Sequence, residues 1–253
     1  MRHILLLVAV LAGAFFCHAN DDDGDMPSTP GGTSSDSNDI FGKDQVCPNF
    51  SSCPKPYVPI SKWPLVITST GCQSGGGMGM MTLGGGDDYR HIEHCCHHKN
   101  ACYQLCGSTK RTCDAELEKC MNLGCDTLHG YSPAKLSSMT NEEIKKEKDG
   151  CMRTKSIVQM IGKFGGCKEF DMLQRSACEC VDGDKVGEKM GRLFRSFYKK
   201  FNPEGVSKVK GLLEKANGKR SMYNKILYGL VKKYPDSIKK KVLEMPASFK
   251  MDL

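Results

Sequence analysis

The sequence lacks a second long apolar run. Its single run, at residues 4–16, follows Arg2 and His3 and precedes the small residue Ala19. A membrane-spanning helix needs about 20 apolar residues, so this run is short for a span, and its flanks are typical of a secretory signal peptide. We therefore expect residues 1–19 to be a cleaved signal and the mature protein to be secreted, extracellular and soluble.

Cysteine is absent from both flanks of the chain. Of the fifteen cysteines, fourteen lie between Cys47 and Cys180, and the remaining one, Cys17, lies in the expected signal. An even number in an oxidising compartment predicts seven disulfides. Because all of them fall within 134 residues, the sequence predicts one disulfide-framed domain over residues 46–185.

Large apolar residues are almost absent between that domain and the signal. Residues 20–45 are rich in Asp, Ser, Gly, Thr and Pro. Such a segment cannot bury enough apolar surface to offset the entropy of ordering its backbone, so we expect a disordered acidic leader. The pattern G-x-x-x-x-G-K-[ST] is also missing, which disfavours a nucleotide-binding loop.

Positive charge is concentrated at the C-terminal end. Residues 191–253 hold sixteen Lys and Arg against five Asp and Glu, a net charge of +11, so the first 190 residues sum to −4 of the chain's +7. Apolar residues recur here at helical spacing: Val209, Leu212, Leu213, Ala216, Tyr223, Ile226, Leu227, Leu230 and Val231. We predict a basic amphipathic helical tail over residues 186–253. Two interpretations stay open: a solvated helical appendage packed on the core, or a surface attracted to anionic lipid.

Between the flanks, the pattern predicts helices separated by loops. Residues 87–105 contain neither Gly nor Pro and predict a helix, and a second helix is expected from about residue 151 to 164. Residues 166–180 end in a Cys-x-Cys pair. Residues 71–86 form a glycine-rich loop, and residues 132–149 form a charged connector with helix-start signals.

Four motifs together resemble the secreted phospholipase A2 family, and most of all its group XII branch. They are STGCQS at 69–74, CCHHKNACYQLCG at 95–107, STKRTCDAELEKC at 108–120 and GCKEFDMLQRSACEC at 166–180. The resemblance covers about residues 47–180. It implies a mainly α, disulfide-rich fold with little or no sheet and two long antiparallel disulfide-linked helices. It also implies the disulfides Cys72–Cys96 and Cys102–Cys180.

The resemblance further implies a mechanism. In that family a helix histidine activates a water that attacks the sn-2 ester, and the next residue, an aspartate, holds Ca²⁺ together with carbonyls of the glycine-rich loop. Counted from the flanking cysteine pairs, the histidine position is Lys99 and the aspartate position is Asn100. A third departure follows Cys180, where Asp182 comes one residue later than the family's orienting aspartate.

These substitutions argue against hydrolysis. A lysine with a pKa of about 10.4 is neutral in only about 1 molecule in 2,500 at pH 7. An ammonium about 5 Å from a divalent cation would be repelled by roughly 7 kcal/mol at an effective dielectric constant of 20, and Asn100 lacks the carboxylate that Ca²⁺ prefers. We expect no cofactor, and a pocket in which Lys99 and Tyr103 contact lipid. If calcium does bind, the resemblance places its ligands at Gly71, Gln73, Gly75 and Asn100.

The histidines near Lys99 suggest two other roles, a replacement general base and a zinc site. His98 could replace the missing base, but it precedes Lys99 by one residue and its side chain is turned by about 100° around the helix. His91, His94 and His98 share one helical stripe and could bind zinc, although a polar helix face is the favoured interpretation.

The sequence thus predicts a secreted phospholipase A2-like protein that binds phospholipid or fatty acid without hydrolysis. The anionic membrane surface is a further expected partner, and nucleic acid is not. One alternative is an active, calcium-dependent phospholipase A2 that hydrolyses the sn-2 ester. The other is a membrane-active or receptor-binding secreted factor that acts through the basic tail.

Overall fold

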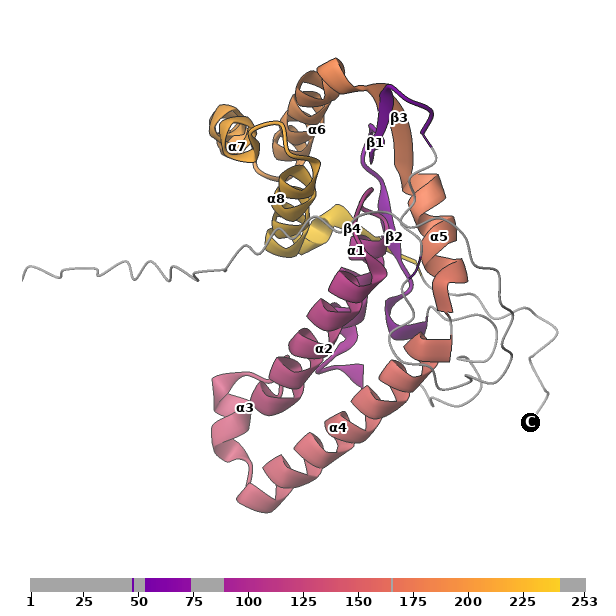
Figure 1. Cartoon of the computed structure of the whole chain (residues 1–253). Helices are drawn as coiled ribbons and strands as arrows, with labels where there is room; N and C mark the ends of the chain where they lie inside the picture. Colours follow the sequence, from indigo (N-terminus) through magenta and orange to yellow (C-terminus); the bar gives the residue numbers. More distant parts are fainter. Residues whose placement is uncertain (1–46, 48–52, 74–88, 165, 242–253) are drawn as a thin grey trace, which may run out of the picture. The chain divides into compact units, whose positions relative to one another are not determined.

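The structure, a computed structural model, describes residues 47, 53–73, 89–164 and 166–241 (Figure 1). The expected signal, the expected leader and Gly75 lie outside these residues. So do most of the glycine-rich loop and the last twelve residues of the expected tail.

The described chain is mainly helical, as predicted. Its α-helices are α1 (Glu93–Tyr103), α2 (Lys110–Thr127), α3 (Pro133–Ser138), α4 (Asn141–Phe164), α5 (Gly166–Ala177), α6 (Val186–Phe201), α7 (Val209–Ala216) and α8 (Arg220–Lys233). Its strands are β1 (Tyr57–Ser61), β2 (Ile67–Ser69), β3 (Cys178–Asp182) and β4 (Ile238–Lys240). In none of the described segments is a helix both long and apolar enough to span a membrane.

The small amount of sheet consists of two separate pairs. β1 pairs with β3 in antiparallel register, with Pro59 opposite Cys180, and β2 pairs with β4 in parallel register, with Ile67 opposite Ile238. The Cys-x-Cys pair therefore lies in a strand, because the helix before it ends at Ala177.

Seven disulfides connect the described residues, the predicted number. They are Cys47–Cys167, Cys53–Cys180, Cys72–Cys96, Cys95–Cys120, Cys102–Cys113, Cys106–Cys178 and Cys125–Cys151. The predicted Cys72–Cys96 pair is confirmed. The predicted Cys102–Cys180 pair is wrong, because Cys102 faces α2 from α1, whereas Cys180 lies on β3, beside the segment that leads from Cys53 into β1.

The predicted pair of antiparallel disulfide-linked helices is formed by α1 and α2. Cys95 and Cys102 of α1 bond to Cys120 and Cys113 of α2, an order that requires the two helices to run antiparallel. The second helix that the sequence predicts, from about residue 151 to 164, is the C-terminal part of α4. That helix, α4, begins ten residues earlier than expected and is bonded to α2 through Cys125–Cys151.

The start of α2 is set by local chemistry. Thr109 has an extended backbone conformation, and its hydroxyl accepts a hydrogen bond from the Thr112 N–H at 3.1 Å. This is an N-cap, which satisfies one of the unpaired donors at the start of a helix. Near the other end of α2, a Cβ on Gly124 would lie 2.4 Å from the His91 carbonyl oxygen, so only glycine permits this close approach to the turn before α1.

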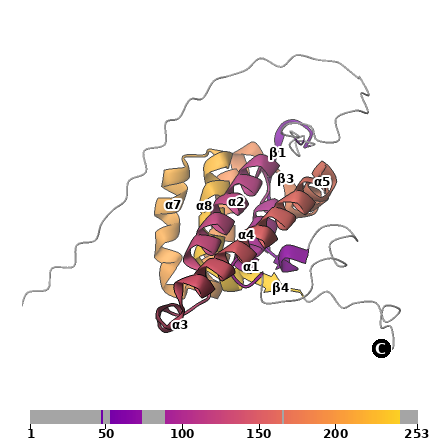
Figure 2. The ribbon, with the colours of Figure 1, turned by 90° about the horizontal axis from the view of Figure 1, so that it is seen from below.

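The basic helices of the predicted tail pack into the largest hydrophobic cluster. Phe194 of α6 and Leu227 of α8 are fully buried there with Ala101 and Leu105 from α1 and the segment after it. α6, α7 and α8 contact one another in chain order and lie together in both views (Figure 2). Their predicted helical and amphipathic character is therefore present, with the apolar faces turned into the protein.

Candidate functional site

Lys99 lies at a buried position between α1 and α4. Its side chain is only 8% exposed and lines a small pocket. The other lining residues are Gly71, Cys72, Cys96, Asn100, Val158, Ile161 and Gly162. The cavity measures about 10 Å³, which is room for about one water molecule or one oxygen atom of a ligand.

The Lys99 ammonium has an aromatic neighbour and no carboxylate within ion-pair distance among the described residues. Its Nζ lies 4.8 Å from the centre of the Tyr103 ring, a cation–π distance. Burial lowers the pKa of Lys99, and the more distant charges of Glu169 and Asp114 partly oppose this effect. The pocket therefore contains a positive charge whose hydration is poorly replaced by the protein.

Tyr103, predicted to contact lipid, is not among the residues that line this pocket. It is 1% exposed, and its hydroxyl donates to Asp114 at 2.5 Å. Burial raises the pKa of Tyr103, and the Asp114 carboxylate adds to this. The hydrogen bond to Asp114 fixes the Tyr103 ring beneath the Lys99 ammonium, where the negative face of the ring meets the positive charge.

Asn100 takes part in a buried hydrogen-bond network. Its Nδ2 donates to the Ser69 hydroxyl at 2.8 Å and to the Gly71 carbonyl at 3.0 Å. The Gly71 N–H donates to the same hydroxyl at 3.1 Å, and Nδ1 of His97 lies 2.8 Å from it. Gln104 extends the network by donating to the Asn100 and Thr68 carbonyls.

The network determines the proton positions on His97. A serine hydroxyl offers two acceptor lone pairs and one O–H donor. Because Gly71 and Asn100 supply two N–H donors, Ser69 donates its proton to His97 Nδ1. His97 is therefore neutral with its proton on Nε2, which lies 3.6 Å from Oε1 of Glu93. Burial and the charge of Lys240 lower the pKa of His97 and favour this neutral form.

Among the family's calcium positions that the structure describes, Gly71 and Asn100 do not fit a divalent cation. The Gly71 carbonyl can only accept a hydrogen bond, so the group of Asn100 that faces it is the amide NH₂, a donor. The Lys99 ammonium lines the same pocket. Ca²⁺ needs several oxygen ligands directed at one point. Gln73 ends the 3-10 turn that begins at Gly71, and Gly75 lies outside the described residues.

His98, considered as a substitute base, does not lie at the pocket that Lys99 lines. It is partly buried. Its ring meets the His94 ring edge-on, with centres 6.0 Å apart. Burial lowers the pKa of His98, and the neighbouring charge of Lys232 adds to this effect.

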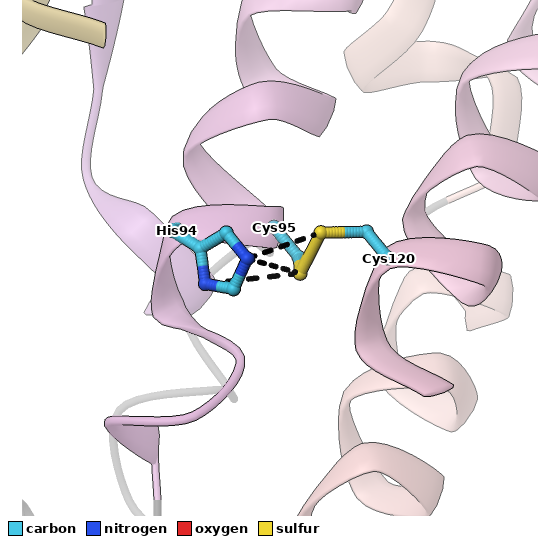
Figure 3. Close-up of side chains that lie close together, drawn as sticks. All are labelled: His94, Cys95 and Cys120. Carbon is cyan, nitrogen blue, oxygen red and sulfur yellow. Dashed lines mark hydrogen bonds between the residues drawn. A yellow bond between two sulfur atoms is a disulfide. The ribbon is translucent and has the colours of Figure 1, made fainter. Parts of the chain in front are cut away.

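The stripe of His91, His94 and His98 does not converge on one point. His91 donates from Nδ1 to the His129 carbonyl at 2.6 Å, and its Nε2 lies 3.5 Å from Glu147. His94 instead contacts a disulfide: its Nε2 lies 3.3 Å from Cys95 Sγ and 3.4 Å from Cys120 Sγ (Figure 3).

In the described segments, one group of side chains has its potential ligand atoms close enough together to hold a metal ion: His94, Cys95 and Cys120. The two sulfur atoms are bonded to each other, so neither cysteine is a thiolate that could ligate zinc, and His94 is left as the single ligand of this group. His94 also stacks on His129 with ring centres 3.9 Å apart, and burial together with these neighbouring rings lowers its pKa to about 4. His94 is thus a neutral ring at physiological pH, packed between the disulfide and His129.

Comparison with curated proteins agrees with the motifs. Over 95 residues, 38% of the chain, the sequence is 28% identical to group XIIA secretory phospholipase A2 of Homo sapiens, of which the match covers 45%. Over 91 residues, 36% of the chain, it is 30% identical to group XIIB secretory phospholipase A2-like protein of Mus musculus, of which the match covers 42%. The chain is similar to group XII secretory phospholipases A2. It spans less than half the length of these relatives, and neither a family model nor a solved structure matches it.

Sequence reasoning missed the residues that organise the site. Ser69, His97 and Gln104 connect α1 to β2 and to the turn at Gly71. Ser69 lies in the quoted STGCQS motif, and Glu93 and His97 have the i, i+4 spacing of a helical ion pair. Those signals were available, but neither reveals that one hydroxyl connects three partners.

Proposed function

We propose that this chain is a secreted phospholipase A2-like protein that binds phospholipid or fatty acid without hydrolysing it. The observation that carries the proposal is the Lys99 ammonium, buried in a pocket beside Val158 and Ile161. An anionic oxygen that enters this pocket gains an ion pair in a poorly hydrated environment, where charge-assisted hydrogen bonds are strong. The seven disulfides and the relatives named secretory support an extracellular location.

The absence of hydrolysis follows from the groups that face the pocket. A general base must be mostly unprotonated and within hydrogen-bond reach of the attacking water. Lys99 keeps its proton unless its pKa falls by several units, and His98 does not line the pocket. Asn100 presents an NH₂ group where the family's metal ligand would be.

Binding to vesicles with and without an anionic lipid tests the role of Lys99. We expect Lys99→Met to weaken binding of anionic vesicles by at least about tenfold, because it removes a buried charge that pairs with the ligand. Lys168→Met is the matched control, since Lys168 is exposed and does not line the pocket. Equal binding by both variants would remove Lys99 from the site.

The alternative function is hydrolysis of the sn-2 ester, which the names of the group XIIA relatives support. A turnover assay on the purified full chain, with calcium and with chelator, separates the two proposals. We expect no calcium-dependent product above that of a heat-inactivated sample. Calcium-dependent hydrolysis that disappears in His98→Ala would establish the enzyme instead.

We propose that the basic tail adds attraction to anionic membranes and does not act alone. Its apolar residues Phe194 and Leu227 are buried in the core, and its lysines Lys208, Lys210 and Lys215 are exposed. Each basic residue near an anionic surface contributes about 1 kcal/mol. Changing the three lysines to Glu in the full chain should therefore weaken vesicle binding more strongly at low salt than at high salt. A salt-independent loss would contradict this role.

A further inference from the structure

A second pocket lies between α6 and the pair of strands β2 and β4. It measures about 130 Å³ and shares no lining residue with the Lys99 pocket. Its wall is formed by Pro64, Leu65, Val66, Ile67, Leu193, Ser196, Phe197, Lys200, Phe201, Ser237 and Lys239. Most of these residues are apolar, but two are lysines and two are serines, of which Ser237 is buried and Ser196 is exposed.

The buried serine has an unmet hydrogen-bonding requirement. Ser237 is 9% exposed, and its Oγ is buried without a hydrogen-bond partner among the described residues. A buried hydroxyl without a partner is costly, and native proteins usually satisfy it with protein, water or a ligand. In a pocket with apolar walls, this hydroxyl marks the place where a polar group of a ligand would bind.

The charges around the pocket indicate which polar group a ligand would carry. Lys200 and Lys239 line the pocket, and no acidic side chain does. Neither lysine forms an ion pair with a described carboxylate, and Lys200 Nζ lies 5.1 Å from the Phe201 ring. An anion that accepts from Ser237 and lies near these two ammonium groups is therefore complementary to the site.

The volume of the pocket indicates the size of the ligand's apolar part. A cavity of about 150 Å³ lined by apolar side chains binds benzene, so 130 Å³ suits an apolar body of about six carbon atoms. Val66 is 55% exposed at this pocket, which leaves an apolar surface along which a longer chain can extend.

We propose that this second pocket binds the anion of a medium-chain free fatty acid. The carboxylate accepts a hydrogen bond from the Ser237 hydroxyl and pairs with Lys200 and Lys239, while the aliphatic chain packs against Leu193 and Phe197. The site is independent of the Lys99 pocket and of the function proposed for it.

The chain carries its own reporter for this site. Its single tryptophan, Trp63, directly precedes the lining residue Pro64 and is 49% exposed. Adding octanoate at neutral pH, below its micelle concentration, should change Trp63 emission in a saturable way. Titration calorimetry on the same full chain gives the dissociation constant. Octanol is the matched uncharged probe and should bind about tenfold more weakly, because it cannot form the charge-assisted bonds.

Three variants test the geometry. Ser237→Ala should weaken octanoate binding by about tenfold, yet leave the thermal stability of the free protein unchanged or higher, because it removes an unsatisfied buried group. A purely structural serine would show the opposite stability effect. Lys200→Met should weaken binding, whereas Lys199→Met, an exposed neighbour outside the pocket, should not. Ser196→Phe, at an exposed lining position, should block binding without unfolding the chain.

Several outcomes would overturn the proposal: no saturable octanoate binding, equal affinity for octanol and octanoate, or wild-type affinity in both Ser237→Ala and Ser196→Phe. Loss of octanoate binding in Lys99→Met with retention in Ser237→Ala would also overturn it, since the ligand would then occupy the Lys99 pocket. Failure of Lys99→Met to affect vesicle binding, with octanoate binding intact, would contradict the proposed function and leave the second pocket supported.

Discussion

The sharpest test of the site's architecture is the removal of one hydroxyl. Ser69→Ala deletes the oxygen that accepts from Gly71 and Asn100 and donates to His97. A buried hydrogen bond contributes about 1 kcal/mol net, and leaving its partner unsatisfied costs about 1–3 kcal/mol. Three bonds are lost at a residue that is 3% exposed, so we expect the free energy of unfolding to fall by about 3 kcal/mol.

Urea denaturation with all disulfides intact measures this change. Ser207→Ala is the matched control: Ser207 is exposed and its hydroxyl donates to the Glu204 carbonyl at 3.4 Å, so we expect a change below about 0.5 kcal/mol. If Ser69→Ala and Ser207→Ala cost the same free energy of unfolding, the Ser69 hydroxyl does not organise the site and does not fix the orientation of Asn100.

Three further changes have distinct readouts. The pKa of His94 is about 4 when folded against 6.5 when unfolded, so the unfolded chain binds more protons and stability falls as pH falls from 6.5 towards 4. After discounting for its partial exposure the loss is about 1.5 kcal/mol. His94→Gln should flatten this slope in urea titrations, and an unchanged slope would contradict the assignment. Lys99→Met should raise the melting temperature or leave it unchanged, because it replaces a poorly compensated buried charge by an apolar side chain of similar length; a large decrease would show that the ammonium is well paired. Peptide mapping under non-reducing conditions should yield a fragment joining Cys102 to Cys113, which Cys102→Ala/Cys113→Ala abolishes at a cost of about 3 kcal/mol; a fragment joining Cys102 to Cys180 would refute the observed pairing.

Cysteine count and charge could be read from the sequence because they are properties of composition. Fourteen cysteines in a chain expected to be secreted predict seven disulfides, and seven are present among the described residues. The helical character of the tail followed from the spacing of residues such as Leu227 and Leu230. Composition does not determine which cysteines form a disulfide with each other, because the pairing depends on how the helices and strands pack.

The error at Cys102 illustrates this limit. Residues 110–127 follow the N-cap Thr109 and form α2, a helix that is not among those predicted from the sequence. With α2 folded back on α1, Cys113 lies next to Cys102, eleven residues away in sequence. The predicted Cys102–Cys180 pair came from the family resemblance, which does not show where Cys113 lies. Recognition of Thr109 as a cap would have placed the helix and changed the pairing.

Lys99 and Asn100 line the same pocket, and this yields a further prediction. In Asn100→Asp a carboxylate replaces the NH₂ that donates to the Gly71 carbonyl, so two acceptors face each other without a proton between them. The repulsion should lower the melting temperature, and a divalent cation could relieve it only if Lys99, which lines the same pocket, were neutral.

We therefore expect calcium to leave the melting temperatures of wild type and Asn100→Asp unchanged. Calcium should raise the melting temperature of the double variant Lys99→Met/Asn100→Asp. Magnesium should raise it less, because magnesium requires stricter octahedral geometry. Lys99→Met alone is the control and should not respond. A calcium response in wild type would show that the present residues do hold the cation. No response in the double variant would show that the carbonyls near Gly71 are not directed at a common point, so that Lys99 and Asn100 are not what prevents calcium from binding.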